Sequence, residues 1–347
     1  MVGRFGCRPA GKTSPHGGES LIREGQAVEN IRQQITNQIV AAIEAGTPPW
    51  RKGWSSPELH RNAKTGQAYK GINQLLLSFT PYSDGRWLTF KQAEVMGVKV
   101  KKGSKGQRIV KMVEVARDRA AADDEGEVLA QDRSTTLVMK GYVVFNAEQV
   151  EGMPEVPRST TNKVEPVAAV DAVIEGMKGT GLTVQYGGGQ PAYAPLTDTI
   201  RMPLPDRFIS TQESAAAKLH ELAHASGHQT RMNRLNLYAR FASEEYAREE
   251  LRAELTSALL GAQFGVPMAA TMVESHASYL SSWLSVLKRD KNEIFRAAAE
   301  AQKIADYLAQ WCPQPVPSTD TAAPRGMIKT GPEGSADASV FARASRF

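Results

Sequence analysis

The stretch 220-HELAHASGH-228 decides the fold of the second half of the chain, because it places histidines at helical spacing on a segment with helix signals at both ends. Ser210 and Glu213 stand upstream of it at the spacing of a capping box. Gly227 is a residue at which helices commonly end in the left-handed conformation. We therefore expect one helix over residues 211–226.

Two histidines of this stretch, His220 and His224, lie at positions i and i+4 and project from the same face of the helix. Their imidazoles are then close enough to bind one metal ion, and Glu221 is turned to one side, where it can reach a water on that ion. In a chain with only 6 histidines, a chance HExxH has odds of about one in a hundred. The spacing predicts a zinc site with Glu221 as its general base.

The third zinc ligand is not evident from this stretch alone. A catalytic zinc needs three protein ligands and an open position for water. His228 lies only four residues after His224, whereas the longer HExxHxxGxxH signature has its third histidine at the position that is Thr230 here. This spacing argues against that class and leaves His228 as a candidate to line the site.

A second predicted helix, over residues 244–264, is a better source of the third ligand. Ser243 can cap it, and Gly265 ends it. In His2Glu zinc peptidases a downstream helix donates a glutamate, and a carboxylate four residues later orients a histidine. We predict Glu250 as the ligand, with Glu254 as the second candidate. The other acids of this helix are predicted to be solvated: Glu244, Glu245 and Glu249.

A zinc ion at this site would lower the pKa of its water and polarise a carbonyl, while Glu221 would pass the proton to the leaving amine. The strand predicted over residues 198–202 could form the edge along which an extended peptide lies. The residue that stabilises the oxyanion stays open among four candidates: His228, Arg231, Tyr238 and Tyr246.

Composition limits the class of protein. A chain of 347 residues is long enough for two domains. The only two cysteines, Cys7 and Cys312, argue against a disulfide framework as the basis of the fold, and a reducing cytoplasm is the expected compartment. No apolar run approaches the length of a membrane span, so we expect a soluble cytoplasmic protein without a membrane partner.

Positive charge is concentrated in residues 86–111, where Glu94 is the single acid. This block predicts a polyanionic partner, since lysine and arginine supply affinity for phosphate. Its cations are Arg86, Lys91, Lys99, Lys101, Lys102, Lys105, Arg108 and Lys111.

The pattern along the chain is typical of an α+β protein. An amphipathic helix is expected over residues 21–45, a short helix near 91–96, and strands over 107–115 and 137–146, with a charged mobile extension between these strands. A helix at 167–178 and short strands at 182–186 and within 192–202 precede the histidine helix. We predict the following division: disordered residues 1–20, a domain over 21–150, a linker over 151–166, a mostly helical domain with a short β-sheet over 167–312, and a disordered tail over 313–347.

Several stretches together resemble the ArdC-type antirestriction proteins of conjugative plasmids and phages, whose N-terminal part is also similar to that of plasmid-borne primases. They follow the family's order over most of residues 25–265. The stretches are the Pro-Pro-Trp segment at 48–50, RNAKTGQAYKGIN at 61–73, RWLTFKQAEVMG at 86–97, VKKGSKGQRIV at 100–110, VFNAEQVEG at 144–152, AYAPLTDTIRMP at 192–203, HELAHASGHQTRMNR at 220–234 and YAREELRAEL at 246–255.

The resemblance implies a small α+β domain that binds single-stranded DNA, followed by a zincin-like metallopeptidase domain, with a role in protecting mobile DNA from host restriction. Exposed aromatic rings can stack on unpaired bases, and cations can contact phosphates. Trp87 and Phe90 are expected to be buried more often than not. The predicted DNA contacts are Trp50, Arg51, Lys52, Trp54, Lys64, Tyr69, Lys70, Lys91, Lys101, Lys102 and Lys105.

Two functions remain open at this point. One is a working zinc peptidase that acts on a peptide or protein substrate and is tethered to DNA by its first domain. The other is a DNA-binding protector whose zinc is structural and proteolytically inactive. Glu221 favours the first, because a purely structural zinc needs no general base, and His228 as a fourth ligand would favour the second. A third hypothesis, a toxin-like domain of a larger phage-encoded polyvalent protein, is less favoured by the length of the chain.

Overall fold

The computed structural model describes residues 31–46, 50, 59–117, 134–155, 165–241, 243–266 and 277–312. Helices alternate with three small sheets, so the predicted α+β class is confirmed. Residues 1–20, the segment 118–133, most of the predicted linker and the tail from 313 lie outside the described residues.

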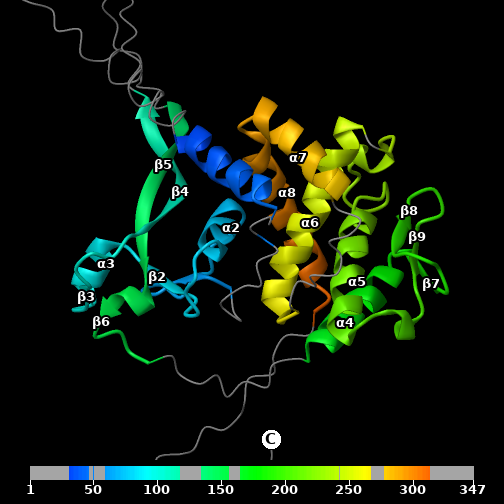
Figure 1. Ribbon diagram of the computed structural model, residues 1–347, viewed down its shortest axis with the longest axis horizontal. Helices are drawn as coiled ribbons and strands as arrows, with labels where there is room; N and C mark the ends of the chain where they lie inside the picture. The colour runs from blue at the N-terminus through cyan, green and yellow to red at the C-terminus, as the bar shows by residue number, and fades with distance from the viewer. Residues whose placement is uncertain are drawn as a thin grey trace, which may run out of the picture.

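The N-terminal part is built on a four-stranded sheet with the order β1-β2-β5-β4. Its two long strands, β4 and β5, pair in antiparallel register and form the ribbon on the left of Figure 1. A second, two-stranded sheet joins β3 to β6. The elements are a helix at residues 31–44, β1 (Arg61–Asn62), α2 (Ile72–Ser78), β2 (Arg86–Leu88), α3 (Phe90–Val95), β3 (Lys99–Val100), β4 (Gln107–Arg117), β5 (Ser134–Asn146), a 3-10 turn (Ala147–Gln149) and β6 (Val150–Glu151).

Polar side chains fix the ends and edges of these elements. Thr89 accepts a hydrogen bond from the Gln92 N–H, and the Gln92 side chain accepts one from the Thr89 N–H, which is a complete capping box for α3. The α2 residue Asn73 bonds both main-chain groups of Val110, at 2.9 Å and 2.7 Å, on the outer edge of β4. Its amide therefore satisfies part of an edge strand that would otherwise present unpaired groups.

The C-terminal part packs helices around α6, beside a three-stranded sheet with the order β7-β9-β8. Figure 1 shows α6 with α8 on one side and α5 on the other, and the sheet beyond α5. None of the helices in the described part of the chain is long and apolar enough to cross a membrane. The elements are α4 (Pro166–Lys178), β7 (Thr183–Tyr186), β8 (Ala192–Ala194), β9 (Thr199–Met202), 3-10 turns at Pro205–Arg207 and Leu235–Tyr238, α5 (Thr211–Ala225), α6 (Glu244–Phe264), α7 (Ala277–Arg289) and α8 (Glu293–Ala309).

The two parts share one hydrophobic core. Ile35 and Ile39 of the first helix belong to the same buried cluster as Leu251 of α6 and Ile304 of α8. Polar contacts cross the same boundary: the main-chain N–H of Gly71 donates to Gln302 at 2.8 Å, and Lys70 pairs with Asp306 at 3.0 Å. The N-terminal part is therefore held against α8 by packing as well as by the covalent chain.

Trp50 belongs to this shared core and corrects one prediction. Its ring is fully buried and lies 5.9 Å from the ring of Trp283 in α7. A ring without exposed surface cannot stack on a base, so the prediction of Trp50 as a DNA contact is wrong. Burying an indole removes a large apolar area from water, which explains why the tryptophan packs inward instead.

The ends of α5 differ in detail from the predicted motif. Ser210 accepts from the N–H of Glu213 at 3.1 Å, but the Glu213 carboxylate takes the N–H of Ile209 at 2.6 Å, one residue before the cap. Gly227 does not adopt the left-handed conformation expected of it, since the helix ends through Ser226 in right-handed geometry. By contrast, α6 starts at Ser243 and ends at Gly265 with φ of 77°, as predicted.

Candidate metal centre

Three buried side chains from α5 and α6 converge on one point. The Nε2 atoms of His220 and His224 lie 3.2 Å apart, and each lies 3.5 Å from a carboxylate oxygen of Glu250. Two donor atoms each about 2.0–2.1 Å from a zinc ion at the tetrahedral angle are about 3.3 Å apart. The separation of the two Nε2 atoms matches this value, and each of the two 3.5 Å distances reaches a different oxygen of Glu250, so the three side chains could hold one divalent ion.

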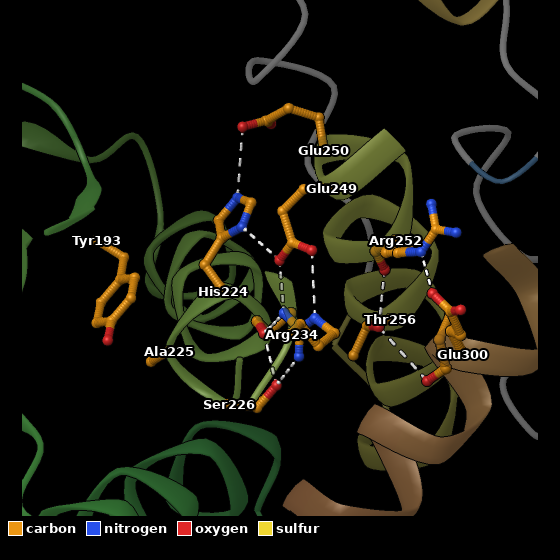
Figure 2. Close-up of polar contacts among 12 residues, drawn as sticks. Tyr193, His224, Ala225, Ser226, Arg234, Glu249, Glu250, Arg252, Thr256 and Glu300 are labelled. Carbon is orange, nitrogen blue, oxygen red and sulfur yellow. Dashed lines mark hydrogen bonds and ion pairs between the residues drawn. The ribbon is translucent and has the colours of Figure 1, made fainter. Parts of the chain in front are cut away.

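A second carboxylate stands behind each imidazole. The Nδ1 of His220 lies 3.6 Å from Glu254, and the Nδ1 of His224 lies 3.3 Å from Glu249. Figure 2 shows Glu250 and Glu249 on opposite nitrogens of the same His224 ring. A carboxylate at Nδ1 keeps the proton there and leaves the Nε2 lone pair for a metal.

These positions separate the two candidates for the third ligand. Glu250 faces the Nε2 atoms, whereas Glu254 reaches only the far side of His220. The prediction that Glu249 is solvated is wrong, because its side chain is 3% exposed. No local signal in the sequence indicated this, because the first turns of α6 are rich in charged residues and the burial comes from the packing of α6 against α5, α7 and α8.

Arg234 holds Glu249 in place. Its guanidinium donates to both Glu249 oxygens, to the Ser226 hydroxyl at 2.7 Å and to the carbonyl of Ala223 at 2.7 Å. A β-carbon at Gly227 would lie 2.8 Å from that guanidinium and 3.1 Å from a carbonyl oxygen of α5. The glycine therefore leaves room for the close passage of Arg234, and it does not serve a left-handed turn.

The ionisable side chains at this centre shift one another's pKa values. Burial alone would raise the pKa of Glu250 and the pKa of Glu249. The imidazoles near Glu250 lower its pKa to about 2. At Glu249, His224 and Arg234 together lower the pKa to about 2. Burial opposes the imidazolium form of His220, yet hydrogen bonds to Glu250 and Glu254 raise its pKa well above the usual value. The carboxylates thus stabilise positive charge at this point, whether it is carried by a proton or by a metal ion.

Glu221 lines a cavity of about 660 Å³ together with His220, His224 and Glu250. Burial raises the pKa of its carboxyl, the two imidazoles oppose this rise, and the main-chain N–H of Tyr193 donates to it. Tyr193 belongs to β8, so this strand and the histidine helix form two walls of the same cavity.

The edge strand that borders the cavity is β8, and this corrects the prediction for residues 198–202. Those residues form β9 apart from Asp198, and β9 is the central strand, pairing with β7 on one side and β8 on the other. Pro191 and Pro195 flank β8, which is the usual position of proline at an edge. Any extended chain in the cavity would therefore meet β8.

His228 does not line the cavity, contrary to its prediction as a site-lining residue. Its Nδ1 lies 2.9 Å from the Thr230 hydroxyl and 3.8 Å from Asp198. Asp198 in turn pairs with Arg231 and accepts a hydrogen bond from the Tyr193 hydroxyl at 2.7 Å. The turn after Gly227 carries His228 towards this network and away from the donor atoms.

The same geometry narrows the candidates for an oxyanion stabiliser. Arg231 is engaged by Asp198 and by the carbonyl of Ala225, with its side chain 1% exposed. Tyr238 is not among the lining residues of the described chain, whereas Tyr246 is and donates to Glu250. Tyr246 is thus the one of the four candidates that lies in the cavity.

Apart from the buried Trp50, the predicted DNA contacts fall into three groups. Arg51, Lys52 and Trp54 lie outside the described residues. Tyr69 is half-buried against the cluster around Trp87. The remaining side chains are exposed, although Lys70 pairs with Asp306 and Lys101 donates to the carbonyl of Glu148; they are Lys64, Lys70, Lys91, Lys101, Lys102 and Lys105.

Sequence reasoning missed other exposed residues of the N-terminal part. Phe90 is 66% exposed, although burial was expected for it, while Trp87 is fully buried as expected. Lys111 and Lys140 stand directly opposite each other in the β4–β5 register, next to the Ile109–Tyr142 pair on the same face. The register of β4 against β5 places Lys111 opposite Lys140. The alternation of side chains along one strand does not predict which residue lies opposite on the next strand.

Two family models match the chain in the same order as the two structural parts. Residues 29–145 match the N-terminal domain of anti-restriction factor ArdC. Residues 169–300 match a zincin-like metallopeptidase.

The curated relatives include proteins of very different length. An Escherichia coli DNA primase TraC is 35% identical over 80% of this chain, which spans only 20% of that protein. A second TraC primase is 35% identical, and the chain spans 27% of its length. The uncharacterized protein y4eC of Sinorhizobium fredii is 34% identical over 82% of this chain and 94% of its own length.

Among solved structures, the metal-free antirestriction ArdC protein from plasmid R388 is 35% identical, with a TM-score of 0.65. It is matched over 81% of this chain and 97% of that one. Its Mn(II)-bound form is 34% identical over the same shares, with a TM-score of 0.63. Because identity, coverage, domain order and fold all agree, this chain belongs to the family of ArdC-type antirestriction proteins, with an ArdC N-terminal domain followed by a zincin-like metallopeptidase domain.

Proposed function

We propose that the second domain is a zinc-dependent peptidase in which His220, His224 and Glu250 hold the ion. The observation that carries this proposal is the convergence of the two Nε2 atoms, 3.2 Å apart, with the Glu250 carboxylate, whose two oxygens each lie 3.5 Å from one of them, beside the cavity that Glu221 lines. Three protein donors leave a coordination position for water, as catalytic zinc sites require and closed structural sites do not.

Each residue has a distinct role in this proposal. Held by His220, His224 and Glu250, a zinc ion would lower the pKa of a coordinated water and polarise the carbonyl of a substrate. Glu221 takes up the proton and delivers it to the leaving amine, held in position by the Tyr193 N–H. Tyr246 lies in the cavity with its hydroxyl near Glu250 and is our candidate to donate to the developing oxyanion.

Zinc is the proposed ion because two imidazoles and one carboxylate are its common ligands in peptidases. A relative was solved with Mn(II), which supports a divalent cation and makes manganese the natural competitor. Equilibrium dialysis against both ions, with metal content measured by mass spectrometry, would separate them. Retention of manganese in preference to zinc would contradict the proposed ion.

The test of the peptidase compares wild type with Glu221→Gln and His220→Ala. We expect wild type to cleave an unfolded protein such as β-casein, Glu221→Gln to retain zinc without cleavage, and His220→Ala to lose zinc. Glu245→Gln, an exposed acid at the start of α6, is the matched control. Stoichiometric zinc in His220→Ala would contradict the ligand assignment.

The alternative function is a DNA-binding protector with a structural zinc. His228, its candidate fourth ligand, lies with Thr230 and Asp198, so the geometry favours an open site. Restriction protection in cells decides between the two. Full protection by the zinc-loaded Glu221→Gln protein would show that proteolysis is not the protective mechanism.

For the first domain we propose binding of single-stranded DNA. The supporting observation is the Lys111–Lys140 pair, because two cations directly opposite each other repel and a phosphate bound between them would relieve that repulsion. Tyr142, 37% exposed on the same face, offers a ring for base stacking beside two phosphate contacts.

We further propose that both activities protect incoming DNA in the cytoplasm, with residues 151–166 as the linker between the two matched domains. Fluorescence anisotropy with single-stranded and duplex oligonucleotides of equal length tests the first domain. Equal affinity for the two would contradict single-strand binding.

A further inference from the structure

Arg231 is a buried cation that joins four elements of the C-terminal part. Its guanidinium donates to the carbonyl of Ala225 at the end of α5, at 2.8 Å, and to the hydroxyl of Thr180 just after α4, at 3.3 Å. The same group pairs with Asp198 in the turn between β8 and β9 and lies 3.4 Å from the hydroxyl of Tyr193 in β8. With a side chain that is 1% exposed, this cation depends on its partners, and the contacts fix these elements relative to one another.

Asp198 is the residue through which this cation reaches β8. Its two oxygens are bound by two different nitrogens of Arg231, which is the forked geometry that a guanidinium and a carboxylate favour. One of these oxygens also accepts the hydroxyl proton of Tyr193 at 2.7 Å. Asp198 has a left-handed φ of 46°, and among the described non-glycine residues only Asn233 shares a positive φ. A residue in this region needs surrounding contacts to hold it there, and such residues cluster at functional sites.

Tyr193 connects this network to the metal centre. It is the middle residue of β8, which is three residues long and pairs with β9 on one side only. Its hydroxyl donates to Asp198, while its main-chain N–H donates to Glu221 in the cavity. Burial and the bond to Asp198 raise the pKa of Tyr193, so the hydroxyl keeps its single proton and gives it to Asp198 rather than to a substrate. The phenol therefore acts on the position of β8 and not on the reaction itself.

We infer that Tyr193, Asp198 and Arg231 form a brace that positions Glu221 for catalysis. This inference rests on the proposed peptidase, because it names the residues that support the general base of the same site. Arg231 fastens Asp198 to the ends of α4 and α5, and Asp198 fastens the ring of Tyr193. The main chain of Tyr193 then holds the carboxylate of Glu221 at the cavity. None of the three brace residues belongs to the metal-binding group, so the brace should control the rate and not the metal content.

The turn after α5 supplies a second arginine with a different target. Arg234 binds Glu249, which stands behind His224, whereas Arg231 acts on the side of Glu221. Two arginines three residues apart thus support two different parts of the centre, a donor imidazole and the general base. Loss of the first should lower zinc affinity, and loss of the second should lower kcat.

The test compares the full, zinc-loaded chain of wild type with Tyr193→Phe and Asp198→Asn, with β-casein as substrate. Tyr193→Phe removes only the hydroxyl, and Asp198→Asn keeps the size of the side chain but loses its charge. A displacement of about 1 Å can reduce a rate by about a hundredfold, so we expect kcat to fall by about 10–100-fold with KM and zinc affinity unchanged. Tyr186→Phe is the matched control, because it removes the same hydroxyl from a half-exposed tyrosine of the opposite edge strand, β7.

A second measurement reports on the brace without any cleavage. Hydrogen exchange at the amide of residue 193 measures how readily its N–H leaves Glu221. Asp198→Asn and Glu221→Ala should each accelerate this exchange. The double variant should exchange no faster than the faster single variant, because substitutions that act through one contact are not additive.

The outcomes for the brace and for the peptidase are distinct. Absence of cleavage by wild type, together with non-additive exchange, would contradict the peptidase and leave the brace intact. Additive exchange, or an unchanged exchange rate in Asp198→Asn, would overturn the brace whether or not casein is cleaved. An unchanged kcat in both variants would overturn it, and so would a fall in kcat matched by an equal loss of zinc in Tyr193→Phe, which would assign the three residues to the fold alone.

Discussion

The Nδ1 atom of His224 lies 3.3 Å from Oε1 of Glu249, on the side of the ring opposite the proposed metal. Arg234 binds the same carboxylate and is anchored to α5 through Ser226 and Ala223. The orientation of the His224 imidazole thus depends on contacts that run through Glu249 and Arg234 back to α5, the helix that carries His224. Removing any member loosens the ring without touching the donor atom itself.

Substitution of Glu249 by glutamine should weaken zinc binding while the fold is retained. The amide keeps the size of the side chain but loses the charge that orients His224 and that Arg234 neutralises. Loss of such a partner typically reduces metal affinity by about 10–100-fold. Competition with a chromophoric chelator measures it, with Glu245→Gln as the control on the same helix. Equal affinities in the two variants would show that Glu249 has no orienting role.

Replacement of Trp50 by alanine should destabilise both domains together. The indole is fully buried and packs on Trp283 across the shared core, so its removal leaves a large cavity. Such a change costs about 3–5 kcal/mol of unfolding free energy. Denaturant unfolding followed by fluorescence and by far-UV circular dichroism measures it, and Phe90→Ala, on an exposed ring, is the control. Separate transitions for the two domains would contradict a shared core.

The double substitution of Lys111 and Lys140 by glutamine should weaken binding to single-stranded DNA and lower its salt dependence. Each lost phosphate contact on a single strand reduces the slope of log affinity against log salt by about 0.7, which gives about 1.4 for the pair. Relief of the like-charge pair should leave stability unchanged or slightly higher. A salt slope equal to that of wild type would show that the face with Lys111 and Lys140 does not contact DNA. A similar reduction of the slope in Lys64→Gln would indicate that DNA binds over a broad surface.

His60 should make the protein less stable in mild acid. Burial lowers the pKa of its imidazole to about 4 from 6.5, and Trp87 donates to its Nδ1 at 3.1 Å. Between these two pKa values the unfolded chain binds a proton that the folded chain does not, so stability is full above pH 6.5 and falls as the pH decreases. The loss approaches about 3 kcal/mol near pH 4.

Unfolding midpoints at pH 7.5 and pH 5 in wild type and His60→Asn would measure this effect. The asparagine oxygen can accept from Trp87 but does not titrate in this range. The variant should therefore lose less stability between the two pH values than wild type does. An identical pH dependence would show that His60 does not carry the acid sensitivity.

Local sequence determined much of the C-terminal fold. Cap residues and periodicity were sufficient for the start of α5 after Ser210 and for α6 between its caps Ser243 and Gly265, because these signals act within one or two helical turns. The i, i+4 spacing was likewise sufficient to bring His220 and His224 together. Glu250 could be named because a zinc site with two ligands needs a third donor, and only one nearby helix offered acids at the right spacing.

Only the tertiary structure decided which acids face which nitrogen, which strand forms the edge, and which aromatic rings are buried. Glu249 and Glu250 are adjacent in sequence, yet the packing of α6 on α5 sends one to each side of His224. The sequence around Trp50 does not indicate that its ring is buried, because its packing partner Trp283 lies more than two hundred residues away in the chain. Long-range contacts of this kind depend on how helices pack, and that information is distributed over the whole chain.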